Sequence, residues 1–92
     1  MSRIERIRDR LAQAFAPVEL AVEDEGHLHA GHAGAATGRG HFRVRIVSEA
    51  FAGQSPVARH RQVYTALGEM MQTDIHALAI SARTPGEATV SG

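Results

Sequence analysis

The sequence contains no cysteine, no lysine and no tryptophan, and its aromatic residues are three phenylalanines and one tyrosine. Without cysteine, neither a disulfide nor a thiolate metal ligand can come from this chain. No apolar run reaches the length of a membrane-spanning helix, and the arginine-rich start lacks the apolar segment of a signal peptide. We therefore expect a cytoplasmic protein that has no membrane partner.

Charges of the two signs are equal in number, because ten arginines balance ten acidic residues. Zero net charge argues against strong, sequence-independent attraction to nucleic acid or to an anionic membrane. The 92 residues are 43% apolar and 22% charged, which is ordinary for a globular protein with one core. The prediction is a single domain over residues 1–92.

The first segment has the pattern of a capped amphipathic helix followed by a strand. Ser2 and Glu5 have the spacing of a capping box. The apolar positions that follow recur at intervals of three and four: Ile4, Ile7, Leu11 and Phe15. Pro17 ends this helix, because the residue before a proline disfavours helical geometry. Residues 18–23 then place a larger apolar side chain at every second position, which favours a strand.

Residues 25–40, EGHLHAGHAGAATGRG, are dominated by glycine, alanine and histidine. Such a composition cannot build a core, and we expect a long loop between two paired strands. Loops of this length inside compact domains are usually functional or disordered. We expect this one to be disordered until a partner binds.

A strand, a helix and a second strand follow the loop. Residues 42–46 alternate between apolar side chains and arginine, the period of a half-buried strand. The Ser-Pro pair at 55–56 supplies an N-cap and a first-turn proline for a helix that extends to about Met71. Residues 75–82 form the last strand, in which the even-numbered positions, beginning with His76, are expected to share one face.

About 26 residues separate these two strands, enough for a crossover, so we expect them to be parallel neighbours. The predicted fold class is α+β in the order α-β-β-α-β, with two helices on one face of a three-stranded mixed sheet. Residues from about 86 to 92 are expected to form a frayed tail.

Three runs of the sequence resemble the BolA family: HFRVRIVSEAFAGQS, RHRQVYTAL and IHALAISARTP. The similarity covers nearly the whole chain, and the histidine-rich loop resembles that of bacterial members. The resemblance implies a fold similar to the class II KH domain. It also implies partnership with a monothiol glutaredoxin through a shared, glutathione-ligated [2Fe–2S] cluster. For bacterial members it further implies DNA-binding regulation of stress and cell-shape genes.

A [2Fe–2S] cluster needs four ligands, and imidazoles can replace thiolates on one iron. A chain without cysteine supplies at most this imidazole half, so the thiolates have to come from a glutaredoxin cysteine and glutathione. The isolated chain, which we expect to be a monomer, should therefore bind no cluster stably.

The resemblance implies His76, at the start of the last strand, as one ligand. A second ligand is implied in the loop, where counting forward from Asp24 gives His29 and counting backward from His41 gives His32. We favour His32, which lies next to flexible Ala-Gly backbone.

Other interpretations of the histidines remain open. His27, His29 and His32 could bind a divalent ion by themselves, although weakly, because a flexible loop lacks a preorganised second shell. His41 and His60 are interpreted as structural residues.

An alternative function uses arginines against DNA. Arg59 and Arg61 lie near the start of the second predicted helix, where the helix dipole favours an anion. Arg43 and Arg45 could extend that surface along the strand. The Gly-x-x-Gly loop of KH domains is absent, since residues 51–55 contain one glycine.

Catalysis finds no support in the sequence. There is no cysteine nucleophile and no Gly-x-Ser-x-Gly motif, and the carboxylates are scattered. We expect the protein not to be an enzyme, which leaves an iron–sulfur adaptor or a transcriptional regulator.

Overall fold

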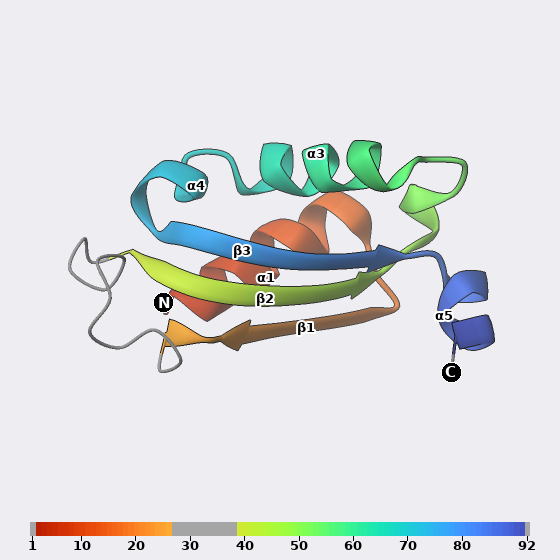
Figure 1. Ribbon diagram of the computed structural model, residues 1–92, viewed down its shortest axis with the longest axis horizontal. Helices are drawn as coiled ribbons and strands as arrows, with labels where there is room; N and C mark the ends of the chain where they lie inside the picture. Colours follow the sequence, from red (N-terminus) through yellow and green to blue (C-terminus); the bar gives the residue numbers. More distant parts are fainter. Residues whose placement is uncertain (1, 27–38, 92) are drawn as a thin grey trace.

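The helices and strands of the computed structural model, which describes residues 2–26 and 39–91, follow the predicted α-β-β-α-β order with short helices added. In chain order they are α1 (Arg3–Phe15), β1 (Glu19–Asp24), β2 (Gly40–Val47), the 3₁₀ helix η2 (Glu49–Phe51), α3 (Pro56–Leu67), α4 (Met70–Thr73), β3 (Ile75–Arg83) and α5 (Pro85–Ser91). Figure 1 shows this arrangement, with α5 at the end of the sheet opposite α4. No helix in the described ranges has the length and apolar character needed to cross a bilayer.

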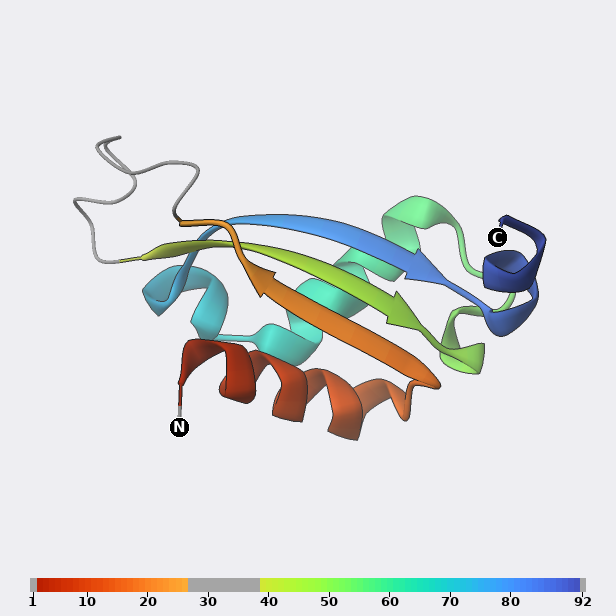
Figure 2. The same cartoon turned by 90° about the horizontal axis from the view of Figure 1, so that it is seen from below.

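The sheet has the order β1-β2-β3, with β1 antiparallel and β3 parallel to the central strand β2. Figure 2 shows α1 and α3 on the same side of the sheet. The alternation of β2 matches this layering, because Phe42, Val44 and Ile46 are buried whereas Arg43 and Arg45 are exposed. We call the side that carries Arg43 and Arg45 the open face. The predicted fold class is confirmed.

The core lies between the sheet and the helices. Its members come from α1, β2, η2, α3, α4 and β3. The fully buried ones are Ile7, Leu11, Val44, Ile46, Phe51, Val63, Leu67 and Ile75, and Phe42 and Met70 are each 2% exposed. Burying one such side chain stabilises a fold by about 1.5–3 kcal/mol. Hydrophobic packing of α1 and α3 against β2 therefore fixes the position of the central strand.

The second predicted helix is shorter than expected. α3 ends at Leu67, and Gly68 has a φ of 56°, which favours glycine. A separate turn, α4, then carries Met70 into the core. The break allows the chain to turn before it enters β3.

The start of β3 differs from the expected alternation. Gly40 pairs with Ile75 but His41 pairs with Ala77, so the register shifts by one residue. Ile75 is buried whereas His76 is exposed, and from Leu78 onward the even-numbered residues pack against the core. The prediction that His76 shares a face with Leu78 is wrong, because a β-bulge inserts an extra residue and changes the phase of the side chains.

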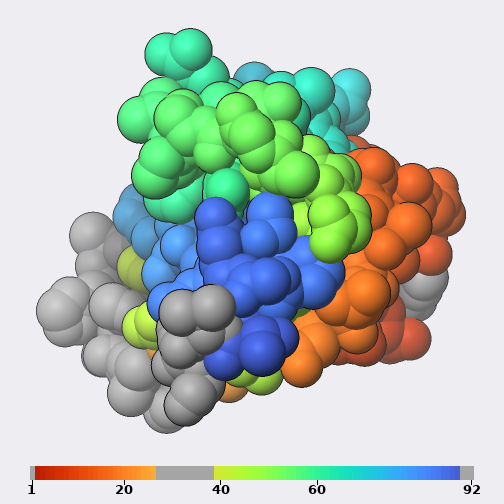
Figure 3. All heavy atoms as spheres, turned by 90° about the vertical axis from the view of Figure 1, so that its right-hand side faces the viewer, coloured from red at the N-terminus to blue at the C-terminus, as the bar shows by residue number. Residues whose placement is uncertain are grey.

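Residues 85–91 form the helix α5 where a frayed tail was expected. Its start has a reciprocal cap: the Thr84 backbone N–H donates to Glu87 Oε1 (2.9 Å), and the Glu87 N–H donates to Thr84 Oγ1 (3.3 Å). Arg59 of α3 donates to both carboxylate oxygens of Glu87, at 2.6 and 3.0 Å. Figure 3 shows α5 in blue beside the green residues at the start of α3. These bonds hold the C-terminal segment on the domain.

The Arg59–Glu87 pair should make stability depend on pH. The hydrogen bonds from Arg59 and from the Thr84 N–H lower the pKa of Glu87 from 4.5 to about 2. A carboxyl group with a lower pKa in the folded state stabilises the fold above its unfolded pKa, and this stabilisation is lost as the pH falls through the folded pKa. We expect Glu87→Gln to lower the Tm at neutral pH and to have little effect near pH 2, measured by thermal unfolding across that range.

Arg59→Gln provides the matched variant for this experiment. It should show the same pH-dependent loss of Tm, with an added pH-independent loss from its bonds to the carbonyls of Gln54 and Ala82. In the double variant the pH-dependent loss should be little larger than in either single variant, because both changes remove the Arg59–Glu87 interaction. A Tm difference that does not change with pH would contradict the assignment.

Candidate functional site

The two histidines at the open end of the β2–β3 pair lie side by side. His41 is the second residue of β2 and is half-buried, and His76 is the second residue of β3 and is exposed. Their ring centroids are 5.1 Å apart, and the ring planes are tilted by 50°. The bulge brings about this contact, because it turns His76 away from the core and toward the side of the sheet on which His41 lies.

Hydrogen bonds from Gly40 and Arg39 hold the start of β3 and the turn before it. The Gly40 N–H donates to the carbonyl of Asp74 at 2.9 Å. The guanidinium of Arg39 donates to the carbonyls of Met71 (2.9 Å) and Ile75 (2.8 Å). The backbone that leads into His76 is therefore held by Arg39 and by the first residue of β2.

The carboxylate of Asp74 ties this region to α1. It accepts hydrogen bonds from Arg6 Nη2 at 2.6 Å and from Arg3 Nε at 3.2 Å. Burial by itself would raise the pKa of Asp74, but the hydrogen bonds from Arg6, Thr73 and Arg3 outweigh it and lower the pKa. Asp74 thus stays ionised and anchors the turn that leads into His76.

The surroundings of His41 on the open face contain a small hollow and an ion pair. The hollow has a volume of about 250 Å³, and Glu25, His41 and Ala77 are among the residues that line it. Arg43 Nε donates to Glu25 Oε2 at 2.9 Å, and Glu23 is the cross-strand partner of Arg43. The positive charge of Arg43 is therefore balanced by carboxylates on β1 and just beyond it.

The loop histidines that the resemblance implies lie outside the described residues. These histidines, His27, His29 and His32, belong to residues 27–38. Both ends of that segment are described: the Glu25 N–H donates to the His41 carbonyl at 2.7 Å, and Arg39 bonds to the start of β3. The chain therefore leaves β1 and returns to β2 at the end of the sheet that carries His76.

The four arginines of the alternative DNA site do not form one surface. Arg43 is paired with Glu25, and Arg45 lies farther along the open face. Arg59 is 11% exposed and is bound by Glu87 and by the carbonyls of Gln54 and Ala82. Arg61 borders a groove between α1 and α3, in the helical layer. Helix α3 thus presents Arg61 but not Arg59 to a ligand.

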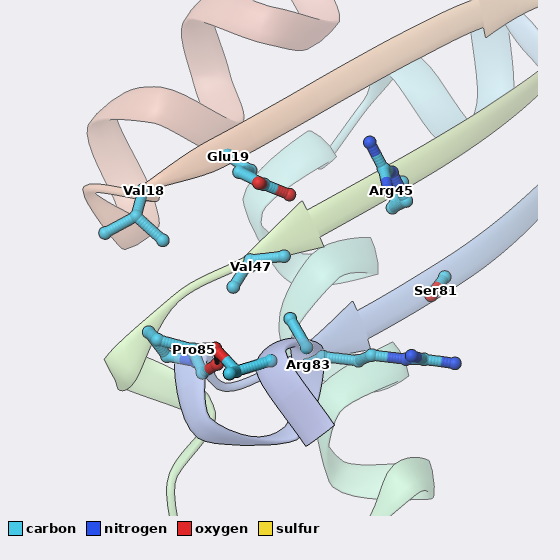
Figure 4. A pocket seen from close by; sticks show the side chains of 9 residues that line it. Val18, Glu19, Arg45, Val47, Ser81, Arg83 and Pro85 are labelled. Atoms are coloured by element: carbon cyan, nitrogen blue, oxygen red, sulfur yellow. Dashed lines mark hydrogen bonds between the residues drawn. The ribbon is translucent and has the colours of Figure 1, made fainter. Parts of the chain in front are cut away.

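A larger hollow, of about 540 Å³, lies at the α5 end of the open face. Figure 4 shows Glu19, Arg45 and Arg83 among the side chains around it. One carboxylate and two guanidinium groups give this end a small excess of positive charge. The histidine pair lies at the opposite end of β2.

Sequence reasoning missed the placement of His41. It was interpreted as a structural strand residue, whereas the structure puts its ring against that of His76. No periodicity signals this contact, because it depends on the strand register and on the bulge. His60, the other histidine interpreted as structural, is half-buried on α3.

Comparisons with known proteins agree on one family. Residues 11–87 match the family described as BolA-like protein. The chain is 50% identical over 91 residues to SufE-like protein 1, chloroplastic/mitochondrial, of Arabidopsis thaliana, covering 94% of this chain and 24% of that protein. It is 47% identical to protein BOLA1, chloroplastic, of the same plant, covering 94% of the chain and 56% of the relative. It is 42% identical to the DNA-binding transcriptional regulator BolA of Escherichia coli (strain K12), covering 87% of this chain and 73% of that protein.

The fold agrees with the same family. The structure of the BolA domain of SufE1 from Arabidopsis thaliana matches with a TM-score of 0.84 and 48% identity, over 95% of this chain and 96% of that domain. The chain spans 24% and 56% of the lengths of the two plant relatives. The similarity therefore concerns one domain of those proteins.

Gly40 should be necessary for the geometry of the histidine pair. A methyl group there would lie 2.7 Å from Cε2 and 2.8 Å from Cζ of Phe42, whose side chain is 2% exposed and cannot move without disturbing the core. We expect Gly40→Ala to reduce the free energy of unfolding by about 1–3 kcal/mol, measured by urea denaturation.

Gly86→Ala is the matched control. Its added methyl would have Thr84 Oγ1 at 4.0 Å as the nearest atom, and alanine favours the helix α5. Its free energy of unfolding should be unchanged or raised, and an equal loss in both variants would argue against crowding at Gly40.

Proposed function

Because the chain belongs to the BolA-like protein family, we propose that it is an adaptor that pairs with a monothiol glutaredoxin. It would contribute histidine ligands to a shared, glutathione-bound [2Fe–2S] cluster, in iron–sulfur trafficking or in redox or iron sensing. The observation that carries the proposal is His76, an exposed imidazole on a rigid strand at the end of the sheet from which the histidine-rich segment leaves and returns.

The donor atoms of this chain fit one half of such a cluster. Two imidazoles can hold one iron of a [2Fe–2S] cluster, and thiolates hold the other. The chain has six histidines and no cysteine, so the thiolates have to come from a glutaredoxin cysteine and from glutathione. His76 is accessible to a partner on the open face, and His32 or His29 is the second ligand that we propose.

This role requires no catalysis by the chain itself. Its part is to hold imidazoles in position, and the hydrogen bonds that fix the start of β3 serve that purpose. We propose accordingly that the protein is not an enzyme.

The decisive experiment mixes the chain anaerobically with a monothiol glutaredoxin, glutathione, iron and sulfide. We expect visible absorption and circular dichroism spectra that differ from those of the glutaredoxin homodimer, because nitrogen ligands replace sulfur on one iron. His76→Ala should abolish the difference, whereas His60→Ala, on α3, should retain it. Retention of the new spectrum in His76→Ala would contradict the proposal.

Single loop variants locate the second ligand. We expect His32→Ala to change or abolish the new spectrum and His29→Ala to leave it intact, measured in the same reconstitution. The opposite result would assign His29. An unchanged spectrum in both variants would show that the second ligand lies outside these two positions.

The name of the Escherichia coli relative supports a second candidate function, DNA-binding transcriptional regulation. The family resemblance implies stress and cell-shape genes as the targets in bacterial members. In this chain Arg59 and Arg43 are engaged by Glu87 and Glu25. The other two arginines assigned to this function, Arg61 and Arg45, lie in different layers of the fold. This distribution favours the adaptor.

Salt dependence separates the two functions. If the protein binds DNA, the affinity for duplex DNA, measured by fluorescence anisotropy, should fall steeply with salt, by a log–log slope of about −0.9 for each phosphate contacted. Arg61→Ala should then reduce that slope. Affinity that is weak at low salt and insensitive to Arg61→Ala and Arg45→Ala would exclude this function, whereas coordination of a cluster should barely respond to salt.

A further inference from the structure

The separation of the His41 and His76 ring centroids is compatible with two imidazoles bound to one metal ion. Zinc–imidazole bonds are about 2.0–2.1 Å long, so each ring centroid lies roughly 3.2 Å from the ion, and a tetrahedral angle places two centroids about 5.2 Å apart. The observed separation is 5.1 Å. The tilt of 50° between the ring planes also distinguishes the pair from a parallel stack.

We propose that His41 and His76 form a chelate for a single divalent transition-metal ion, without a partner protein and without the loop histidines. Imidazole nitrogen suits zinc, nickel, copper and cobalt rather than magnesium or calcium. Within residues 2–26 and 39–91 no group of three or more metal-binding side chains comes together. On this proposal, water would complete the coordination sphere of the ion.

The two histidines are held side by side by the backbone in the absence of an ion. Both histidines are on paired strands, and sites on strands are held more precisely than sites on loops. The Gly40–Asp74 hydrogen bond and the two bonds from Arg39 fix the bulge between them. Little ordering of the backbone is therefore needed for binding.

The charges around the pair are of both signs. The Arg39 guanidinium lies on the carbonyl of Ile75, next to His76, whereas carboxylates lie on the side of His41. Arg43 is the next residue of β2 on the open face, and its guanidinium is bound by Glu25 and stands opposite Glu23. The positive charge nearest to His41 along its own strand is thus compensated. Ala77, the cross-strand partner of His41, leaves space beside the imidazole.

The site has a regulatory consequence that rests on the proposed function. His76 would be a ligand in both states, so a divalent ion held by His41 and His76 would exclude the shared cluster. Assembly with a glutaredoxin and binding of the free ion then compete for the same imidazole. A rise in free divalent metal would reduce cluster formation.

The test titrates Co²⁺ and Zn²⁺ into the chain carrying His27→Ala, His29→Ala and His32→Ala, so that the loop contributes no imidazole. We expect one ion per chain by isothermal titration calorimetry, with a visible Co²⁺ spectrum of nitrogen coordination. His41→Ala or His76→Ala in this background should weaken binding by at least about tenfold, since even the loss of an outer-shell partner costs that much. His60→Ala is the control and should bind as before.

Amide chemical shifts of each variant show whether a loss of binding comes from the missing imidazole or from misfolding. Zn²⁺ should shift the signals around positions 41 and 76 and leave those of α3 unchanged. His76→Gln provides a second variant at an exposed position, where a change should not disturb the core. Absence of binding in the loop-substituted chain, or undiminished binding in both His41→Ala and His76→Ala, would overturn the site.

Competition is measured separately with the glutaredoxin. Zn²⁺ added before reconstitution should suppress the mixed spectrum in the native chain and should suppress it less in His41→Ala. If Zn²⁺ binds but the spectrum forms undiminished, the competition is refuted. If no mixed spectrum forms under any condition, the proposed function fails while the metal titration still decides the site.

Discussion

Strand β3 pairs in parallel with β2, and one extra residue at the start of that pairing decides where His76 lies. Without the bulge, the strict alternation of β3 would place His76 on the side of Leu78, against the helices. With it, Ile75 enters the core and the imidazole reaches the open face. The hydrogen bonds from Gly40 and Arg39, together with the Asp74–Arg6 pair, all act on this one stretch of backbone. Hydrophobic packing holds the sheet against the helices, whereas these polar contacts act at the bulge that decides which side of the sheet each side chain of β3 faces.

Most of the fold followed from local chemistry. The capping box at Ser2, the alternation of β2 and the Ser-Pro start of α3 each predicted an element that the structure contains. Helix α5 was missed although Thr84, Pro85 and Glu87 carry an N-cap, a first-turn proline and a reciprocal cap, because seven residues at the end of a chain are too few to be stable alone. The ion pair with Arg59 is a tertiary contact that the helix gains in the folded domain, and it joins residues 28 positions apart in sequence.

The candidate site was less predictable than the fold. His76 was selected from family resemblance, and its exposure agrees with a ligand role without testing it. His41 could not be selected, because its neighbour depends on a register shift that no pattern of apolar residues records. Arg59 was assigned to an anion from its place at a helix start, yet a helix start attracts a carboxylate of the same chain as readily as a phosphate. Glu87 occupies that role.

The proposed cluster and the proposed ion site both use His76 and differ in the second histidine. On the proposed function, His76 has two possible companions: His41, fixed beside it by the strands, and a histidine of the 27–38 segment, whose ends meet the sheet at the same place. A rigid companion needs no ordering and suits a small ion bound by the chain alone. A histidine of residues 27–38 would serve a cluster that a second protein presents, and the contacts of that protein would contribute to the free energy of assembly. The choice between the two companions would therefore follow from whether the partner is present.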